Sequence, residues 1–484
     1  MLVFQESELE DLLNTVITNM IPQRSPSQKP VPANVLFLAS RYAHYYANQE
    51  LLDRLLTAAM DRISEVIERH QWDMTILAFW IANTTLLLHY IQKDSRVLSA
   101  TAHFQPQLID LINEIFVLII RDAERRIDRI FDAAMLDYEP IVGFEDIRFQ
   151  NEWRLFRSKP KMKPPEPAER GYRPPLPQAR AKPAPQSVTS LLSSTLFVLD
   201  LYDVHPNLIV QIMAQLFYWI GAEIFNRVMA SRQYLARTKA MQVRMNISAL
   251  EDWARNNDRK TEHLGDGTLN SPTPASYDAA RQHLSPPSQL LQWLQCFSHI
   301  GDDREMLITT VHQLPRLTPE QLLHSANRYR LEIGEKGLSK SAKATLFKMM
   351  QEYHDARARR PGSSPRSKRA KNHTQDSSSP DSVRANGRAL SGRGDDSSAA
   401  ENDDDSEEEG GASRKLLMDP ALMLPFSLPT SGEMFIQYGS QRSRSSASEL
   451  RKYTPTVPPE FLARLDQRGQ SRALPDFEDT GWAD

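Results

Sequence analysis

Apolar residues recur at spacings of three and four through most of this chain, which is the period of an α-helix with one buried face. No segment of useful length alternates apolar and polar residues as a half-buried strand would. The pattern begins at 7–20, where Ser7 and Glu10 are placed as a capping box. It marks further predicted helices at 33–47, 50–70, 73–92, 105–131, 187–203, 206–230, 237–256, 287–300, 318–328 and 341–353. The chain is therefore predicted to be all-α.

The predicted helix 73–92 is apolar nearly all round, so neighbouring helices are expected to enclose it. Its apolar run, 74–91, contains Asn83, Thr84, Thr85 and His89 and is shorter than a comfortable membrane span. We interpret it as a buried core helix and predict no transmembrane segment. The N-terminus lacks the basic start and continuous apolar stretch of a signal peptide, so secretion is not expected.

Prolines are clustered rather than scattered, which indicates ordered blocks joined by linkers. Nine of the 32 prolines fall in 159–186 with seven Lys or Arg and only two Glu, so this segment is predicted to be a Pro-rich basic linker. The segment 354–414 is rich in Arg, Lys and Ser and then holds nine acids and no base between 395 and 409. It is predicted to be a disordered insertion because neither half can build a core. Apolar character returns only in 415–437.

A family resemblance rests on three stretches between 191 and 255, which read LLSSTLFVL, QLFYWIGA and MQVRMNISALEDW. They resemble the central motif of the dilute domain, the cargo-binding globular tail of class V myosins. Supporting segments stand in the family's order at 35–43, 78–89, 317–323, 416–420 and 424–426. With neither a motor domain nor a coiled coil, the chain looks more like the free-standing fungal dilute-domain proteins. Some of these carry ankyrin repeats ahead of the domain, and this chain begins almost directly on a domain helix, as a truncated sequence would.

The resemblance implies an elongated multi-helix bundle in two subdomains with long disordered insertions. It assigns 1–158 to the N-terminal helical subdomain and 187–353 to the dilute core with the C-terminal helical subdomain. It assigns 415–437 to a segment that docks on the bundle, and leaves 438–484 as a mostly disordered tail. It also implies partners, namely trafficking adaptors or Rab-like small GTPases, and it implies no enzyme.

Tryptophans are enriched in binding hot spots, so Trp80, Trp219 and Trp253 are candidate recognition residues. Each stands among apolar residues at helical spacing, and we therefore favour packing in the core. Cys296 has His299 three residues on, but no oxyanion loop or orienting acid accompanies the pair, so core packing is also favoured there. The scattered His44, His70, His89 and His205 do not have the spacing of metal ligands. The sequence thus predicts no catalytic residue, metal site or cofactor.

Arg244 has two interpretations: it contacts an acidic partner, or it pairs internally with Glu251 or Asp252. We favour the internal pair. Asn246 and Ser248 are interpreted as caps of a helical turn at 247–255.

Two linker segments offer binding motifs. Pro174 and Pro177, with Arg180 nearby, form a polyproline-helix ligand for an SH3-domain protein. The basic segment 357–371 is a candidate for nuclear import or polyanion binding through Arg366, Lys368, Arg369 and Lys371. We favour a solvated linker there, with its charge offset by the acidic block. Ser364 and Ser379 each precede proline, so phosphorylation is hypothesised to shift that balance.

The favoured function is a non-catalytic adaptor or cargo-binding module in vesicle or organelle trafficking, which binds partner proteins through grooves of the bundle. The alternative is a nuclear or nucleic-acid-associated scaffold directed by 357–371. A net charge of −3 does not favour a nucleic-acid partner, and none is expected. The single cysteine fits a reducing compartment, so the favoured localisation is cytoplasmic, at Golgi, vesicles or cortex, with the nucleus as the alternative.

Overall fold

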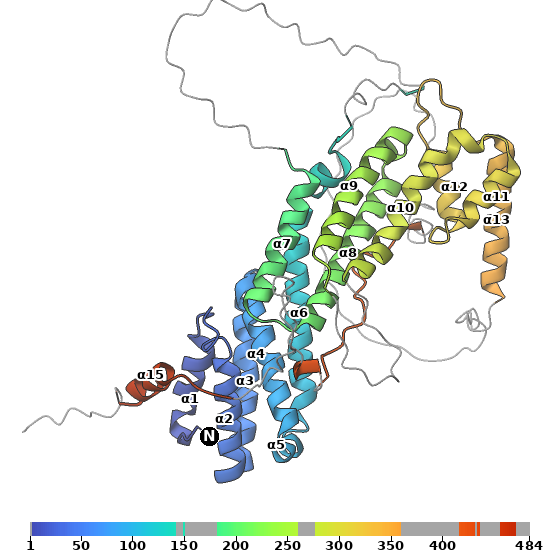
Figure 1. The fold of residues 1–484 in the computed structure, drawn as a ribbon. Coiled ribbons are helices and arrows are strands. Elements are labelled where there is room, and N and C mark those ends of the chain that lie inside the picture. The colour runs from blue at the N-terminus through green and yellow to red at the C-terminus, as the bar shows by residue number, and fades with distance from the viewer. Residues whose placement is uncertain are drawn as a thin grey trace, which may run out of the picture.

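The computed structural model describes residues 2–141, 149–150, 182–259, 276–359, 416–430, 433–435 and 455–470. Within these residues every named element is a helix or helical turn, and the β-type pairing is an isolated antiparallel bridge between Phe149 and Glu332. The predicted all-α, elongated fold is confirmed (Figure 1). Most of the predicted linker 159–186 and of the predicted insertion 354–414 lies outside the described residues.

The N-terminal part of the chain supplies six α-helices and three helical turns. The α-helices are α1 (Leu9–Leu13), α2 (Val31–Tyr46), α3 (Gln49–Arg69), α4 (Met74–Lys93), α5 (Ser95–Ala100) and α6 (Phe104–Asp128). A 3-10 turn (Glu6–Glu8) precedes α1, and π-helical turns follow α1 (Asn14–Thr18) and α6 (Asp132–Leu136). The predicted capping box at Ser7 and Glu10 is wrong. Because the chain enters the first turn at Glu6, the Glu8 carboxylate takes the third position and accepts the backbone N–H of Gln5 at 2.7 Å.

The later helices are α7 (Pro185–Leu201), α8 (Pro206–Ala230), α9 (Arg237–Asn256), α10 (Ser276–Ile300), α11 (Arg304–His312), α12 (Pro319–Arg328), α13 (Lys340–Ala358) and α15 (Pro459–Gln470). Pro206 stands in the first turn of α8, where its missing N–H costs nothing. Thr318 and Gln321 form a capping box on α12: the Gln321 N–H donates to Thr318 Oγ1, and the Thr318 N–H donates to Gln321 Oε1.

The helices form one elongated body. α1–α5 gather at the end that holds the N-terminus, α11–α13 form the opposite end, and α6–α10 run between them (Figure 1). The buried apolar side chains join in one connected cluster, which includes Phe4 near the start of the chain and Phe461 in α15. The same cluster includes Leu346 of α13, so it reaches both ends of the body.

α4 and α8 are the most apolar helices of this body. By length and composition both could cross a membrane, but 83% of the apolar window of each is buried inside the protein. The prediction that 74–91 is a buried core helix is confirmed. The hydroxyl groups of Thr84 and Thr85 are satisfied within the helix, because they donate to the carbonyls of Trp80 and Ile81 in the preceding turn.

α8 approaches α10 closely at Gly221. A Cβ at this position would lie 2.3 Å from the backbone oxygen of His283 on α10. Pro287, one turn further along α10, has no N–H to offer to that oxygen. Gly221 therefore lets the two helices meet at the point where the α10 backbone is left without its usual intrahelical bond.

Candidate functional site

The segment 416–430, hereafter the strap, lies against α8 although α8 comes two hundred residues earlier in the chain. α8 meets it with a row of polar side chains on a mostly apolar helix: Gln211, Gln215, Tyr218 and Asn226. Their spacings are close to whole numbers of helical turns, so the four side chains share one face. We call this row the α8 polar stripe.

Three carboxamides of the stripe each make a pair of hydrogen bonds with the strap backbone. Asn226 donates to the Met418 carbonyl at 2.9 Å and accepts the Met418 N–H at 2.8 Å. Gln215 donates to the Leu422 carbonyl at 3.0 Å and accepts the Leu424 N–H at 2.8 Å.

Gln211 repeats the arrangement on Ser427, with both bonds at 2.8 Å. The hydroxyl of Tyr218 adds a bond to the Asp419 carbonyl at 2.7 Å, and burial raises the pKa of Tyr218. As the strap residue number rises, the matching α8 residue number falls, so the strap runs antiparallel to α8. The stripe recognises peptide groups rather than side chains, and an amide paired in this way fulfils the hydrogen-bonding needs of a segment that has no helix or sheet of its own.

The strap is anchored at both ends and by apolar side chains along its length. Gln321 of α12 donates to the Leu416 carbonyl at 2.8 Å. Beyond the strap's other end, His205 bonds the Glu433 carbonyl at 3.2 Å. The ring of Phe426 packs on Phe116 of α6 with centroids 4.8 Å apart, and Leu417, Met418 and Leu428 pack against the core. The strap thereby ties the α12 end of the molecule to α6.

A charged cluster lies between α6 and α8. The guanidinium of Arg227 is 2.8 Å from Glu223, 2.6 Å from Asp128 and 2.5 Å from Asp132, and it stacks over the ring of Phe131. Burial alone would lower the pKa of Arg227, but the hydrogen bonds to the three acids outweigh it and raise the pKa. One cation thus holds two neighbouring elements of the body together.

Beside this cluster lies Glu124, an acid whose pKa is far above its ordinary value. Burial raises its pKa to about 7; Arg121 acts against that rise and the charge of Glu223 adds to it. A carboxyl with that pKa exchanges its proton near neutral pH at the α6–α8 boundary.

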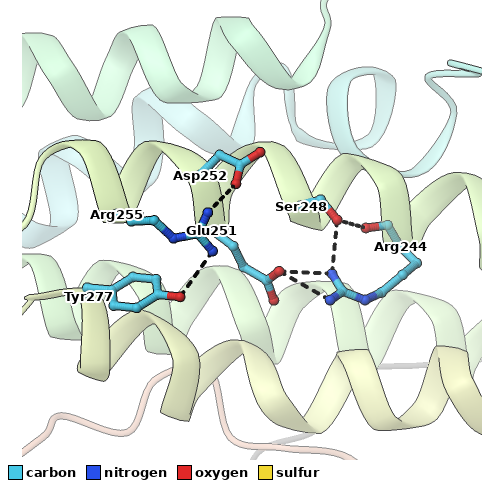
Figure 2. Close-up of polar contacts among 6 residues, drawn as sticks. All are labelled: Arg244, Ser248, Glu251, Asp252, Arg255 and Tyr277. Carbon is cyan, nitrogen blue, oxygen red and sulfur yellow. Dashed lines mark hydrogen bonds and ion pairs between the residues drawn. The ribbon is translucent and has the colours of Figure 1, made fainter.

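The outer face of α9 carries a second charged network, drawn in Figure 2. Arg244 reaches Glu251 at 3.1 Å and the hydroxyl of Ser248 at 3.3 Å, so the favoured interpretation of an internal pair is confirmed. Asp252 instead pairs with Arg255 at 3.0 Å, and Arg255 also bonds the hydroxyl of Tyr277 at 3.1 Å. The network balances its own charges and leaves no excess charge for a partner to match.

The predicted caps at Asn246 and Ser248 are wrong. α9 is continuous from Arg237 to Asn256, so neither residue stands at a helix end. Asn246 is buried and donates instead to the carbonyls of Met135 and Tyr138, at 3.1 and 3.0 Å. It therefore fastens α9 to the turn after α6.

Two of the three tryptophans lie in the core as favoured: Trp80 is 1% exposed and Trp219 is 8% exposed. Trp253 is half-buried, and its indole N–H donates to the hydroxyl of exposed Ser193 on α7 at 2.8 Å. Cys296 is half-buried on α10, and burial raises the pKa of its thiol, which weakens it as a nucleophile.

The residues predicted for linker functions lie outside the described residues. They are Pro174, Pro177 and Arg180 for an SH3-domain protein, Arg366, Lys368, Arg369 and Lys371 for import or polyanion binding, and Ser364 and Ser379 for phosphorylation. These assignments stay predictions.

An apolar pocket opens between α3, α4 and α6, with Gln105 as the polar residue in its wall. It is lined by Leu56, Ala59, Met60, Ile63, Leu87, Ile91, Phe104, Gln105 and Leu108. Within the described part of the chain, no group of three or more His, Cys, Asp or Glu side chains is placed to hold a metal.

Sequence reasoning missed the α8 polar stripe. Its signal is present, because Gln211, Gln215 and Asn226 recur on one face of a helix whose other positions are almost all apolar. A polar row on a buried helix indicates that something polar must cover it, and here the cover is peptide backbone.

The family model of the DIL domain matches residues 211–333 of this chain. The match begins within α8, the helix that carries the α8 polar stripe. The predicted resemblance to the dilute-domain family is thereby confirmed.

The chain is similar to fungal dilute domain-containing proteins and to myosins. It is 29% identical over 475 residues to a dilute domain-containing protein of Schizosaccharomyces pombe, covering 97% of this chain and 73% of that protein. It is 21% identical over 466 residues to one of Saccharomyces cerevisiae, covering 71% of this chain and 52% of that protein. Human unconventional myosin-Va is 24% identical over 348 residues, but the chain spans only 17% of its length.

Solved structures of the same fold are myosin tails. The apo structure of Myo2-GTD superposes with a TM-score of 0.55 at 12% identity, covering 96% of this chain and 98% of that one. A myosin V cargo binding domain superposes with a TM-score of 0.52 at 13% identity, covering 74% and 86%. Myo2-GTD has also been solved in complex with Inp2, Smy1 and Mmr1, each with a TM-score of 0.51 to this chain.

Proposed function

We propose that this protein is a non-catalytic adaptor that binds partner proteins in vesicle or organelle trafficking, in the cytoplasm. The observation that carries the proposal is the likeness of its helical body, over 96% of the chain, to Myo2-GTD, a domain whose solved complexes hold Inp2, Smy1 and Mmr1. Trafficking adaptors and Rab-like small GTPases are the proposed partner classes, and Golgi, vesicles or cortex the proposed sites of action.

The arrangement of the polar and charged side chains supports a role in binding rather than in catalysis. The most elaborate polar site, the α8 polar stripe, binds peptide backbone, and the charged networks around Arg227 and Arg244 are satisfied within the protein. A rigid helix array presents grooves between helices that accept an amphipathic helix or an extended peptide.

Proximity labelling of the full chain in cells tests this proposal, beside a version that lacks 354–414. We expect labelled trafficking GTPases, vesicle adaptors or myosin-associated proteins, and the shortened version shows whether the insertion changes that set. Recovery of none of these classes with either version would contradict the trafficking role.

The predicted nuclear scaffold is separated from this proposal by the same chain with Arg366, Lys368, Arg369 and Lys371 neutralised. A cytoplasmic distribution that does not change on neutralisation excludes the import role. An SH3-domain partner is tested by replacing Pro174 and Pro177 with alanine in the labelling experiment, which should remove SH3-domain proteins alone from the labelled set.

A further inference from the structure

α15 is a second late segment that returns to the body, and it lies beside α1 and α2 at the N-terminal end (Figure 1). Its contacts are few but specific. Phe461 is 5% exposed and joins the core, while Val457 and Leu465 pack against the core from outside. Phe461 and Leu465 are four residues apart, so they present one apolar face of the helix, and α15 contacts α1 directly.

The body carries a polar group that meets the backbone leading into α15. Asn34 of α2 is 2% exposed and its side-chain amide donates to the Thr456 carbonyl at 2.7 Å. Tyr90 of α4 holds that amide in place by donating its hydroxyl to Asn34 Oδ1 at 2.9 Å. Because the bond is made to a peptide carbonyl, any segment that follows the same path can accept it.

α15 itself has little to keep it in place. It is 12 residues long, a length at which an isolated helix is marginal in water. Glu460, which bonds Gln28 at 3.3 Å, is exposed, and Leu462 is 36% exposed beside the buried Phe461. A short helix with one deeply buried anchor opens at low cost while the rest of the molecule stays folded.

We propose that the surface formed by α1, Gln28 and Asn34 is a docking site for an amphipathic helix, and that α15 occupies it until a partner's helix replaces it. The partner helix has an aromatic anchor and a leucine one turn later, the Phe-x-x-x-Leu spacing of α15. This inference rests on the binding role proposed above and names one surface for it. A tethered helix competes at a high effective concentration, so α15 sets a threshold that only a well-matched partner exceeds.

A labelled peptide of residues 455–470 tests the proposal on the full-length chain by fluorescence anisotropy. The released variant carries Phe461→Asp with Leu465→Asp, and the matched control carries Leu462→Asp at the exposed position of the same helix. We expect the released variant to bind the peptide at least about tenfold more tightly than the wild-type chain does, because tethered α15 no longer competes. The Leu462→Asp chain should bind the peptide as the wild type does, and a peptide with Phe461→Ala should bind neither chain.

A second measurement needs no variant. Saturating peptide made with heavy isotopes is added to the wild-type chain, and hydrogen exchange of the chain's own α15 is followed by mass spectrometry. Faster exchange in α15 on addition of peptide supports replacement. The proposal is overturned if exchange does not change, if the released variant fails to bind the peptide, or if wild-type and released chains bind it equally. It is also overturned if the wild-type chain is a dimer that the released variant loses, since α15 then docks between copies. None of these outcomes depends on cargo, so labelling of trafficking proteins can succeed or fail independently.

Discussion

The strap and α15 return to the same helical body in different ways. The strap meets α8 through three paired carboxamides and the Tyr218 hydroxyl, and its apolar side chains pack along α6 and the core. α15 and the backbone that leads into it meet the body through the Asn34 amide, one exposed hydrogen bond from Gln28 to Glu460, and one deeply buried ring, Phe461. Both use a side-chain amide to bind peptide backbone, so the recognition chemistry is shared. The strap backbone is bound by several such amides, whereas the backbone that leads into α15 is bound by one. We therefore interpret the strap as a permanent part of the fold and α15 as an exchangeable one.

The double substitution Gln215→Ala with Asn226→Ala tests the strap most directly, because it removes two of the three paired carboxamides that hold it on α8. The two substitutions remove four part-buried hydrogen bonds to the strap backbone, and at about 1 kcal/mol for each bond we expect a combined loss of about 4 kcal/mol in the free energy of unfolding. Urea denaturation measures it. Gln295→Ala is the matched control, because Gln295 bonds the Leu291 carbonyl of its own helix, and it should cost less than about 1 kcal/mol. Equal losses in both proteins would mean that the paired amides do not hold the strap.

Gly221→Ala disturbs the opposite contact of α8, the one with α10. The added Cβ would meet the His283 backbone oxygen at 2.3 Å, which cannot be relieved by a side-chain rotation, so we expect a loss of about 3 kcal/mol. Hydrogen exchange should become faster in the strap, which α8 carries, and stay unchanged in α15. Gly337→Ala is the control: its Cβ would meet only the flexible end of Leu331 and should cost far less. Faster exchange in α15 as well would show that both segments depend on α8.

Glu124→Gln is expected to change how the stability of the helical body depends on pH without changing the docking of α15. The pKa of Glu124 is raised from 4.5 to about 7 in the folded protein, chiefly by burial, so the folded state binds the proton more tightly than the unfolded state. The free energy of unfolding therefore falls as pH rises between those two values and stays lower above them. At about pH 8 we expect the Gln variant to be more stable than the wild type by about 2 kcal/mol, and at about pH 4.5 to differ little.

Urea unfolding across that range, with Glu65→Gln on the exposed face of α3 as control, measures the difference. α15 docking, followed by peptide binding, should not change with this variant, because Glu124 faces Arg121 and Glu223 rather than α1 or α2. A flat difference between wild type and Glu124→Gln across the range would contradict the raised pKa.

The features that could be predicted from the sequence are those formed by residues close together in the chain. Helical period predicted the all-α fold and the burial of 74–91, and apolar spacing predicted that Trp80 and Trp219 lie in the core. The pairing of Arg244 with Glu251 was predictable because seven residues span about two turns of one helix.

Features that join distant segments were not readable in the same way. Asn246 was expected to cap a helix because Asn commonly does so, but its acceptors are carbonyls of the turn after α6, more than a hundred residues earlier. Gln215 and Asn34 likewise meet backbone that any sequence could supply, so no pattern in their partners marks them. Charge and periodicity describe one segment at a time, whereas these amides are defined by the segment that covers them.

A matched pair of phenylalanines gives the finest test of the comparison. Phe426 of the strap is half-buried against Phe116, whereas Phe461 of α15 is only 5% exposed. Burial alone predicts that Phe461→Ala costs more. If α15 opens independently, however, the loss cannot exceed its docking free energy, and we expect about 1 kcal/mol for Phe461→Ala against about 2 kcal/mol for Phe426→Ala. Urea denaturation of both variants decides between the two rankings, and a larger loss for Phe461→Ala would make α15 an integral part of the core.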